Sequence, residues 1–525
     1  MNEELLHVAG GLGLFLFGMA IMTEGLRGLA GNLLHRTLSR CTRSAATGAL
    51  SGALVTAVLQ SSSATTVAAV GFVSAGLLTF VQALGVVFGA NLGTTVTGWL
   101  VALLGLKLSI GGLSLPLILL GALARLFGRG RLASGGTALA GFGLIFLGIG
   151  FLQQGMAGYE GVVTPDTFPD DTLEGRLLLV LLGVAITLVT QSSSAGVATA
   201  LTAVYTGTID FPQAAALVIG MDVGTTVTAA LATVGGSLDT RRTGYSHVIY
   251  NLLTACGALL LLTPYTLAWE WLAPGGLAQH AELALVGFHT LFNFLGIVLV
   301  LPFAPAFAAL MNRLVAPGDE GLDRRLDRLL LKEPAVALDA AVRAIREITA
   351  DTLRLVGSLL EQPERRDAEH LRRVGGAVDR LQEFVDGIHL LPEQVEDWRR
   401  LNSLIHLLDH LQRLLDRCEE EPERVETLAA VAPLRDAGAN MQEMIHQVLA
   451  ELAAGEWDTA QHTTQQFHRV LERQAETLRS AIMAEMAAGR VDIPEGTAHL
   501  EAVRWLRRGA AHIARVFAHL QTLQK

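Results

Sequence analysis

The chain has 525 residues, of which 51% are hydrophobic and 17% are charged, and its formal net charge at pH 7 is −10. A mean hydropathy of +0.43 excludes an ordinary soluble protein of this length. The acidic balance argues against nucleic-acid binding, and three scattered cysteines provide no disulfide framework or metal-ligand spacing.

The composition changes near Pro317. Residues 1–316 carry 12 basic and 13 acidic side chains, whereas residues 317–525 carry 27 and 36. A membrane part is therefore followed by a charged, soluble part. The predicted segments are a first membrane repeat at 1–130, a second repeat with a final helix at 131–316, a linker at 317–334 and a helical domain at 335–525.

Long uncharged runs fill the membrane part, and each provides the roughly 20 residues that a membrane helix needs. These runs are Leu5–Thr23, Leu132–Tyr159, Thr243–Trp269 and Leu283–Asn312. No charge occurs between Arg43 and Lys107, so this stretch must hold several embedded segments. The N-terminus lacks the basic region of a signal peptide, and we expect the helix from Leu5 onward to be retained.

Two short motifs occur twice in the membrane part. The segment Gln60–Ala64, with sequence Gln-Ser-Ser-Ser-Ala, recurs as Gln191–Ala195. The segment Gly93–Thr97, with sequence Gly-Thr-Thr-Val-Thr, recurs as Gly224–Thr228, and both pairs share one offset of 131 residues. Repetition at a single offset indicates an internal duplication.

Loop charges predict that the two copies have opposite orientations, because Lys and Arg collect on the cytoplasmic side of short loops. The loop after the first helix holds Arg27, Arg36, Arg40 and Arg43. The equivalent loop of the second copy holds Glu160, Asp166, Asp170, Asp171 and Glu174. This is the inverted-repeat arrangement of secondary transporters. We predict an N-terminus outside and a cytoplasmic C-terminal domain.

The segments flanking the first Gln-Ser-Ser-Ser motif, Ser44–Leu59 and Ala64–Thr79, are short for a full crossing. We interpret them as re-entrant hairpins, although two full crossings would leave the same loop parity. The predicted fold is all-α: a polytopic membrane protein with two inverted-topology repeats containing re-entrant hairpins, followed by a soluble helical bundle.

The repeated Gln-Ser-Ser-Ser motif predicts an anion site. At a hairpin tip it would begin a half-helix, whose free amides and positive dipole end favour an anion. The serine hydroxyls and the glutamine amide would add hydrogen-bonding groups. The alternative is that these residues only hold helices together. Two copies in symmetric positions favour a binding role, since packing alone does not require the same tetrapeptide twice.

The repeated Gly-Thr-Thr motif predicts a cation site. Asn91 and Asp222 precede the two copies, and Gly93 or Gly224 would let the helix unwind and expose carbonyl oxygens to a hard cation such as sodium. A carboxylate such as Asp222 inside an apolar span is functional by default. Because the predicted site has no basic side chain, bound cations would neutralise the anion.

Three further features have simpler interpretations. His247 and Asn251, like His289 and Asn293, are spaced to lie on one helix face, and we favour interhelical hydrogen bonding for both pairs. Glu24 is expected to pair locally with Arg27. No nucleophile with a base, metal-ligand spacing or nucleotide loop occurs, so no enzymatic activity and no cofactor are predicted.

These paired motifs resemble the type II sodium/phosphate cotransporter family over about residues 5–312. The resemblance implies sodium-driven phosphate movement, with both serine motifs at the substrate and ion site. The chain departs from the family pattern at Asp222, where Asn is usual. This departure leaves the sodium count and any proton coupling open.

The resemblance and the motifs together give one set of candidate substrate- and ion-binding residues. They are Gln60, Ser61, Ser62, Ser63, Asn91, Thr94, Thr95, Gln191, Ser192, Ser193, Ser194, Asp222, Thr225 and Thr226. Sodium is expected near Gln60, Asn91, Gln191 and Asp222. The partners are inorganic phosphate, sodium and the lipid bilayer of the cell inner membrane, while a homodimer and a cytoplasmic regulatory partner are left open.

The C-terminal part changes to amphipathic helices, with breaks expected at Pro363, Pro392, Pro422 and Pro494 in a bundle of about six helices. Its length and register resemble a PhoU-type regulatory domain. The acidic residues match the metal-binding clusters of such domains only in part, so we interpret them as a solvated face and predict no metal site. They are Asp379, Glu383, Asp386, Asp409 and Asp416.

The predicted function is sodium-coupled symport of inorganic phosphate by alternating access, with a cytoplasmic regulatory domain. A membrane phosphate sensor without transport is one alternative, since a regulator-like domain is fused to the membrane part. A sodium-coupled transporter of another anion is the second. Uptake and export are not distinguished at this stage.

Overall fold

The structure is a computed structural model. It describes residues 3–30, 37–38, 41–74, 77–107, 111–159, 161–232, 238–315, 326–363, 367–390, 394–420 and 422–523. These residues form helices and turns without a strand, which confirms the all-α prediction. The chain divides into two compact units, Met1–Pro317 and Gly318–Lys525, and each is described by itself below.

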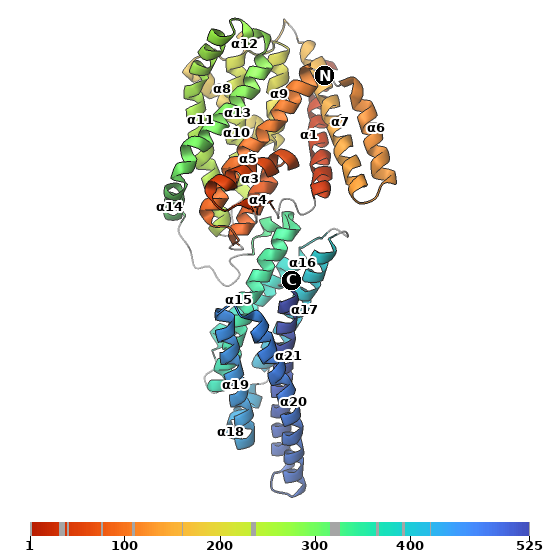
Figure 1. Cartoon of the computed structure of the whole chain (residues 1–525), viewed down its shortest axis with the longest axis vertical. Coiled ribbons are helices and arrows are strands. Elements are labelled where there is room, and N and C mark those ends of the chain that lie inside the picture. The colour runs from red at the N-terminus through yellow and green to blue at the C-terminus, as the bar shows by residue number, and fades with distance from the viewer. Residues whose placement is uncertain are drawn as a thin grey trace. The chain divides into compact units, whose positions relative to one another are not determined.

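The first unit (Figure 1) consists of long apolar helices and several shorter ones. Its helices are α1 (Glu3–Ala30), α3 (Ala45–Leu59), α4 (Ser62–Ser74), α5 (Phe80–Leu100), the π-helix η1 (Val101–Lys107), α6 (Gly111–Phe127), α7 (Arg131–Ala157), η2 (Pro165–Thr167), α8 (Leu173–Thr190), α9 (Ser193–Tyr205), α10 (Phe211–Ala232), α11 (Leu238–Leu272), α12 (Gly276–Gln279), α13 (Ala281–Val300), η3 (Leu301–Phe303) and α14 (Ala304–Leu314). Among the described residues, six helical segments are long and apolar enough to cross a membrane.

The six segments confirm the predicted membrane helices. They are Glu3–Ala30, Phe80–Leu106, Arg131–Ala157, Leu173–Thr190, Thr240–Leu272 and Ala281–Leu314. Three of them contain the uncharged runs Leu5–Thr23, Thr243–Trp269 and Leu283–Asn312, and a fourth covers all but the last two residues of Leu132–Tyr159. Large apolar side chains such as Leu181 and Leu260 lie exposed on the helix surfaces, as expected for contact with lipid.

Helices α1, α7 and α6 pack side by side at one edge of this unit (Figure 1). The contact between α1 and α7 is lined by small residues: the backbone of α7 at Gly148 and Gly141 lies against Gly11 and Gly18 of α1. Small residues let two helix backbones approach closely, which is the common way that helices associate in membranes.

The duplicated sequences occupy equivalent places in the packing. Helix α3 packs on α5, and α8 packs on α10. A Cβ atom at Gly89 of α5 would overlap the carbonyl group of Ala49, and one at Gly220 of α10 would overlap that of Val180. Both members of this contact are related by the offset of 131 residues. The duplication therefore extends to three-dimensional contacts, whereas the opposite membrane orientation of the copies stays a prediction.

Each Gln-Ser-Ser-Ser motif lies at the tip of a helical hairpin, between α3 and α4 and between α8 and α9. Helices α3, α4 and α9 have 15, 13 and 13 residues and are shorter than a membrane crossing requires. Helix α8 has 18 residues and is long enough. The tip positions agree with the predicted hairpins, and their re-entrant course through a bilayer stays a prediction.

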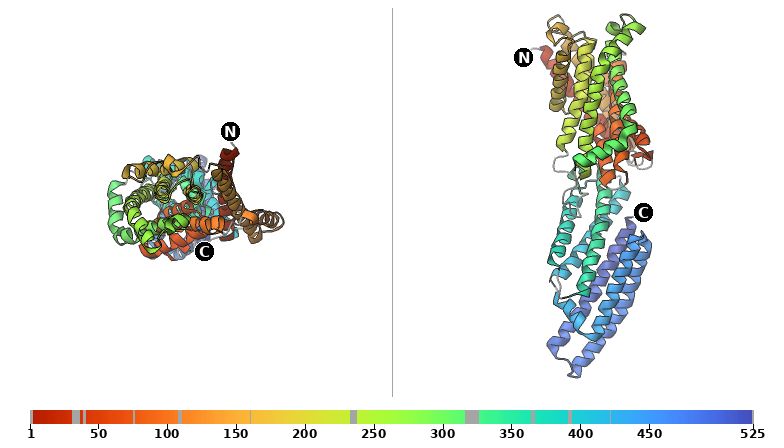
Figure 2. Two further views of the ribbon diagram at one scale, coloured as in Figure 1. Left: turned by 90° about the horizontal axis from the view of Figure 1, so that it is seen from above. Right: turned by 90° about the vertical axis from the view of Figure 1, so that its left-hand side faces the viewer.

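The second unit is a bundle of long amphipathic helices. Its elements are η4 (Arg328–Lys332), α15 (Pro334–Glu361), α16 (Ala368–Asp386), α17 (Val395–Glu420), α18 (Pro422–Ala430), α19 (Ala432–Ala453), α20 (Trp457–Ala487) and α21 (Ile493–Thr522). Helices α20 and α21 form a long hairpin that both side views show (Figures 1 and 2). The core includes Trp505, Phe517 and Leu404, each at most 1% exposed.

The helix breaks expected from proline are present at three of the four predicted positions. Helix α15 ends just before Pro363, α18 begins at Pro422 and α21 begins one residue before Pro494. Pro392 lies outside the described residues. The sequence analysis missed a further break at Val431, where Pro433 enters the first turn of α19. Seven α-helices are therefore described from Pro334 onward, rather than about six.

Candidate functional site

The candidate residues lie on two hairpin tips and two long helices. Gln60–Ser63 form the tip between α3 and α4, and Gln191–Ser194 form the tip between α8 and α9. Helix α5 carries Asn91 and the following threonines, and α10 carries Asp222 with its own pair. Helix α9 packs against α5 as well as α10, while α4 packs against α5 and α11. The second tip helix thus contacts the first repeat.

The two glutamines have the same unusual backbone conformation. Gln60 and Gln191 both have φ of 54°, and they are the only non-glycine residues with positive φ among those described. Each caps the helix before it, and its side-chain Nε2 donates over 2.6 Å to a carbonyl three residues earlier, that of Ala57 or Leu188. A left-handed conformation costs free energy for a residue with a side chain, and such strain gathers at functional sites.

The first serine of each motif caps the helix that follows. Ser61 Oγ accepts a hydrogen bond from the amide of Ala64 over 3.3 Å, and Ser192 Oγ accepts one from Ala195 over 3.2 Å. The N-termini of α4 and α9 keep further amides and the positive end of the helix dipole. Each serine motif therefore places a hydroxyl-capped helix N-terminus at its turn, and the binding of an anion there stays a prediction.

Arg27 corrects the expectation of a site without a basic side chain. Its Nη2 lies 3.4 Å from Ser61 Oγ, so a guanidinium from the last turn of α1 reaches the first serine motif. The sequence argument considered only residues of the same span, whereas tertiary packing brings α1 against α3. The local pairing of Glu24 with Arg27 was also wrong, because Glu24 lies 3.9 Å from Arg125.

Asn91 is held by the first His-x-x-x-Asn pair. It is 9% exposed, and its Oδ1 lies 3.0 Å from Nε2 of His247 on α11. Its Nδ2 donates to Oδ1 of Asn251, one turn further along α11, over 2.5 Å. Both polar ends of Asn91 are therefore occupied by one face of α11.

Asp222 is held by the second pair in an equivalent way. Nε2 of His289 on α13 lies 3.2 Å from Oδ1 and 3.3 Å from Oδ2 of the carboxylate. Nδ2 of Asn293 donates to Oδ2 over 2.8 Å. The carboxylate thus sits among hydrogen-bonding side chains, which offsets part of the cost of placing it in an apolar span.

Two hydrogen bonds tie these centres together. Asn251, which accepts from Asn91, also donates through Nδ2 to the main-chain carbonyl of Asp222 over 2.9 Å. Thr97 of α5 donates to Gln60 Oε1 over 2.7 Å and so connects the first hairpin tip to the same helix as Asn91. Polar contacts therefore join the first tip to α5 at Thr97, and separate contacts join Asn91 of α5 through α11 to α10.

The threonines after the glycines are bonded to their own helices. Thr94 and Thr225 donate to carbonyls four residues back, and Thr95 and Thr226 to carbonyls three residues back. Helices α5 and α10 continue through Gly93 and Gly224, so the expected unwinding there was wrong. Gly93 instead lets α5 pack closely on α3 at Thr56, and Gly224 lets α10 pack closely on α8 at Thr187.

Sequence reasoning left several contacting residues outside the candidate set. They include Arg27, Thr97, His247, Asn251, His289 and Asn293. The interhelical hydrogen bonding expected for the His-x-x-x-Asn pairs is present in the structure. One sequence signal could have indicated the partners of these pairs. The His-x-x-x-Asn pair occurs twice, and so does a polar residue, Asn91 or Asp222, before Gly-Thr-Thr.

The second unit contains a cluster of four histidines between α17 and α21. Ring centroids lie 5.4 Å apart for His406 and His519, 5.4 Å for His410 and His512, and 5.8 Å for His410 and His519. Burial, followed by the positive charges of His410 and Arg417, lowers the pKa of His512 to about 4. Burial also lowers the pKa values of His410 and His519. His410, His512 and His519 are therefore largely neutral near pH 7.

The acidic residues weighed in the tail make local contacts. Glu383 lies 3.9 Å from Arg328, Asp409 pairs with Arg413 over 2.9 Å, and Gln412 donates to Asp416 over 3.1 Å. Within the part of the chain that the structure describes, no group of three or more His, Cys, Asp or Glu is placed to hold a metal ion.

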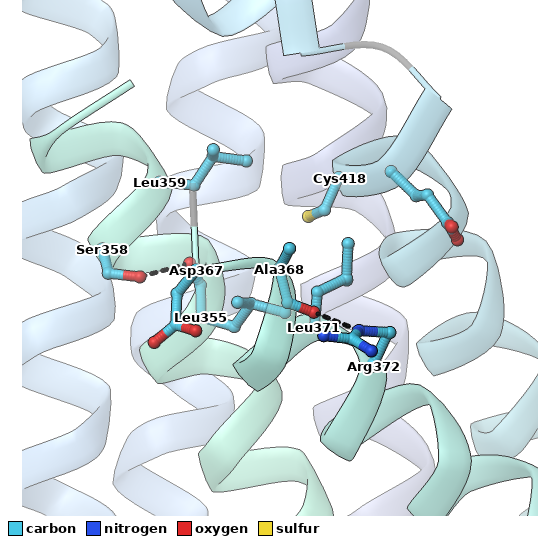
Figure 3. Close-up of a pocket in the computed structure, with 9 residues that line it drawn as sticks. Leu355, Ser358, Leu359, Asp367, Ala368, Leu371, Arg372 and Cys418 are labelled. Carbon is cyan, nitrogen blue, oxygen red and sulfur yellow. Dashed lines mark hydrogen bonds between the residues drawn. The ribbon is translucent and has the colours of Figure 1, made fainter. Parts of the chain in front are cut away.

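A pocket of about 260 Å³ also lies in this unit (Figure 3). Its lining comes from α15, the start of α16 and the end of α17: Leu355, Ser358, Leu359, Asp367, Ala368, Leu371, Arg372, Cys418 and Glu419. Ser358 donates to Leu355 O over 2.9 Å and Arg372 to Ala368 O over 3.2 Å. Burial raises the pKa of the Cys418 thiol to about 12, so this thiol is unreactive near pH 7.

A family model described as Na+/Pi-cotransporter matches residues 14–154 and 169–297, which together contain both serine hairpins, α5 and α10. The chain belongs to the Na+/Pi-cotransporter family. The two matched ranges correspond to the two copies of the internal duplication, so the family assignment and the repeated contacts concern the same part of the molecule.

Relatives of this Na+/Pi-cotransporter family member match between 57% and 85% of the chain. "Uncharacterized protein YqeW" of Bacillus subtilis (strain 168) is 32% identical over 57% of this chain and 95% of its own length. "Putative inorganic phosphate export protein YjbB" of Escherichia coli (strain K12) is 28% identical over 77% of this chain and 69% of its own length. The protein of the same name in Salmonella typhimurium is 27% identical, with 85% and 83% covered. No solved structure matches the chain.

Proposed function

We propose that this chain moves inorganic phosphate across a membrane together with sodium, by alternating access, and that its C-terminal unit regulates the movement. One observation carries the proposal. The two Gln-Ser-Ser-Ser tips have the same left-handed glutamine and the same serine-capped helix start, and polar contacts join the first tip to α5 and, separately, α5 through α11 to α10. Family membership and the printed names of the YjbB relatives support phosphate as the cargo.

Phosphate would bind at the starts of α4 and α9. Free amides, serine hydroxyls and the helix dipole all favour an oxyanion there. Arg27 adds a fixed positive charge at the first tip, 3.4 Å from Ser61 Oγ. Because a guanidinium pairs with two phosphate oxygens at once, Arg27 would orient the anion as well as attract it.

Sodium would bind where oxygen atoms gather around Asn91 and Asp222. Sodium is a hard cation and prefers carboxylate, amide and hydroxyl oxygens. The carboxylate of Asp222 supplies a negative charge in this region, and the glutamine caps place helix C-terminal carbonyls beside each serine motif. A cation held there would offset the charge that phosphate brings into the apolar span.

The proposal is tested by radiolabelled phosphate flux with the purified full-length protein in proteoliposomes. We expect an inward sodium gradient to drive phosphate into the vesicles, and an outward gradient to drive it out. Phosphate flux that does not depend on the sodium gradient would contradict sodium coupling. Competition by sulfate or a carboxylate would indicate that the transported anion is not phosphate. Phosphate binding without flux in either direction would instead indicate a membrane sensor.

A further inference from the structure

We propose that helices α17 and α21 of the second unit form a binding site for an anion that carries several phosphate groups. The candidate transport residues all belong to the first unit, so this would be a different site. Binding there does not require the transport proposed above. The evidence is a set of basic side chains that line the contact between the two helices.

Basic residues recur at helical spacing on both helices, so that each helix presents them along one stripe. The stripe on α17 consists of His406, His410, Arg413 and Arg417. The stripe on α21 consists of His512, Arg515 and His519. The two helices pack against each other, and histidine rings of the two stripes lie 5.4 to 5.8 Å apart. These seven residues are called the basic seam below.

The positive charges of the basic seam act on one another. Burial lowers the pKa of His512 first, and the positive charges of His410, Arg417, Arg515 and Arg413 lower it further. All four side chains are therefore within electrostatic reach of the His512 ring. Like charges held this close repel one another, and an anion bound among them would relieve the repulsion.

Nearby carboxylates offset only part of this charge. Asp409 pairs with Arg413 over 2.9 Å, and its Oδ2 lies 3.6 Å from Nδ1 of His410. Asp416, further along α17, accepts a hydrogen bond from Gln412 over 3.1 Å. The three guanidiniums of the seam stay charged at any pH near neutrality, so the seam attracts anions even while its histidines are neutral.

Two ring nitrogens of the basic seam have no partner. Nδ1 of His410 and Nδ1 of His512 are buried, and neither makes a hydrogen bond among the described residues. A neutral imidazole has one N–H donor, so each ring can donate to an anion without becoming charged. A buried polar nitrogen without a partner costs free energy, which a bound oxyanion would recover. The two rings come from different helices and face one anion from two sides.

Phosphate groups suit these donors. A guanidinium pairs with two phosphate oxygens at once. One phosphate group carries about −1.5 to −2 charges and three strong acceptor oxygens, so it would accept from an arginine and an imidazole together. The stripe from His406 to Arg417 spans eleven residue steps (417 minus 406), or roughly 16 Å along the helix. A short chain of phosphates would contact several of these side chains, whereas a single phosphate ion would contact few.

Isothermal titration calorimetry of the purified full-length protein in detergent tests the site, with tripolyphosphate as the probe at fixed ionic strength. Arg515→Gln is the test variant, because Arg515 is exposed and its replacement leaves the core intact. We expect its dissociation constant to rise roughly 10–100-fold, the effect of one charge-assisted hydrogen bond. Arg479→Gln is the matched control and should bind as the wild type does, since Arg479 is exposed on α20 beside Glu476.

Equal dissociation constants in wild type, Arg515→Gln and Arg479→Gln would overturn the inference. Any tripolyphosphate that the first unit binds contributes equally to all three proteins. Replacement of His410 by glutamine, His410→Gln, is the second test variant. It should weaken binding as well, and unchanged affinity would exclude the imidazole from the site.

Inorganic phosphate and a glutamate peptide serve as comparison probes. We expect both to bind the wild type more weakly than tripolyphosphate does. A glutamate peptide that binds as tightly would overturn the assignment to phosphate, and inorganic phosphate that binds as tightly would overturn the assignment to a chain of phosphates. None of these measurements requires transport. Absence of phosphate flux in proteoliposomes would therefore reject the proposed function alone.

Discussion

The side-chain amide of Asn251 donates a hydrogen bond to the main-chain carbonyl of Asp222 over 2.9 Å. The same side chain accepts from Asn91 over 2.5 Å. Asn251 is 2% exposed and so links the two repeats through a single buried group.

Replacement of Asn251 tests this link. Asn251→Ala leaves Asn91 Nδ2 without its partner, and an unsatisfied buried group costs about 1–3 kcal/mol. We expect a lower melting temperature of the full-length protein in detergent and a loss of phosphate flux. Cys256→Ala is the control, because Cys256 is exposed on the same helix. Equal melting temperatures and equal phosphate flux in the two variants would show that the hydrogen bonds of Asn251 do not stabilise the protein.

The equivalence of Gly89 and Gly220 predicts equal sensitivity to an added methyl group. Gly89→Ala and Gly220→Ala each force a Cβ atom into a carbonyl group of the neighbouring helix, which should cost about 1–3 kcal/mol of stability. Gly150→Ala and Gly257→Ala are matched controls, since nothing lies within 4 Å of a Cβ at either position. Thermal unfolding in detergent compares the melting temperatures of the two pairs. Melting temperatures of Gly89→Ala and Gly220→Ala equal to those of the controls would contradict the close helix contacts at these glycines.

Arg27 is expected to attract phosphate to the first tip. Arg27→Gln removes the positive charge beside Ser61, and loss of a charge-assisted hydrogen bond of about 1.5–3 kcal/mol corresponds to a phosphate half-saturation constant raised roughly 10–100-fold. Arg176→Gln is the comparison, because Arg176 pairs with Asp171 and Thr263 away from the candidate residues. An unchanged phosphate half-saturation constant in Arg27→Gln would show that Arg27 does not take part in phosphate binding.

The histidine cluster predicts a pH-dependent stability of the C-terminal unit. The folded pKa of His512, about 4, lies below its ordinary value of 6.5, so the unfolded state binds more protons between these pH values. The contribution of His512 to the free energy of unfolding is therefore fully present above pH 6.5, and it is lost as the pH falls toward 4. The contribution of His512 at pH 5 is on the order of 1 kcal/mol once solvent screening is included.

His512→Gln isolates this contribution, because glutamine keeps polarity without a titrating ring. We expect its melting temperature to fall less between pH 7 and pH 5 than that of the wild type, followed by the helical circular-dichroism signal of the full-length protein. His446→Gln is a histidine control on α19, outside the cluster. An equal decrease in wild type and His512→Gln would contradict the assignment.

Local patterns predicted much of the fold and the positions of both glutamines at turns between helices. The uncharged runs gave the long helices, because length and apolarity alone decide whether a segment can cross a membrane. The repeated motif placed Gln60 and Gln191 at hairpin tips, where the structure gives both the same left-handed backbone. Prolines indicated most breaks in the tail, since proline in a helix interior removes a backbone hydrogen bond and clashes with the preceding turn.

Contacts between distant segments could not be predicted in this way. Arg27 reaches Ser61 across 34 residues, and Glu24 meets Arg125 rather than its neighbour, because tertiary packing decides which charges meet. Helix continuity at Gly93 was misjudged because glycine there serves close packing on Thr56, not a break. The partners of His247 and His289 required the fold as well, since they lie 156 and 67 residues away.

A cryo-electron microscopy map of the full-length protein in lipid nanodiscs, with phosphate and sodium added, tests the central claim most directly. The account predicts a single phosphate-sized density touched by serines of both tips, Ser61–Ser63 and Ser192–Ser194, in the middle of the membrane region. A map in which these two segments lie far apart, or face lipid with phosphate bound elsewhere, would contradict it.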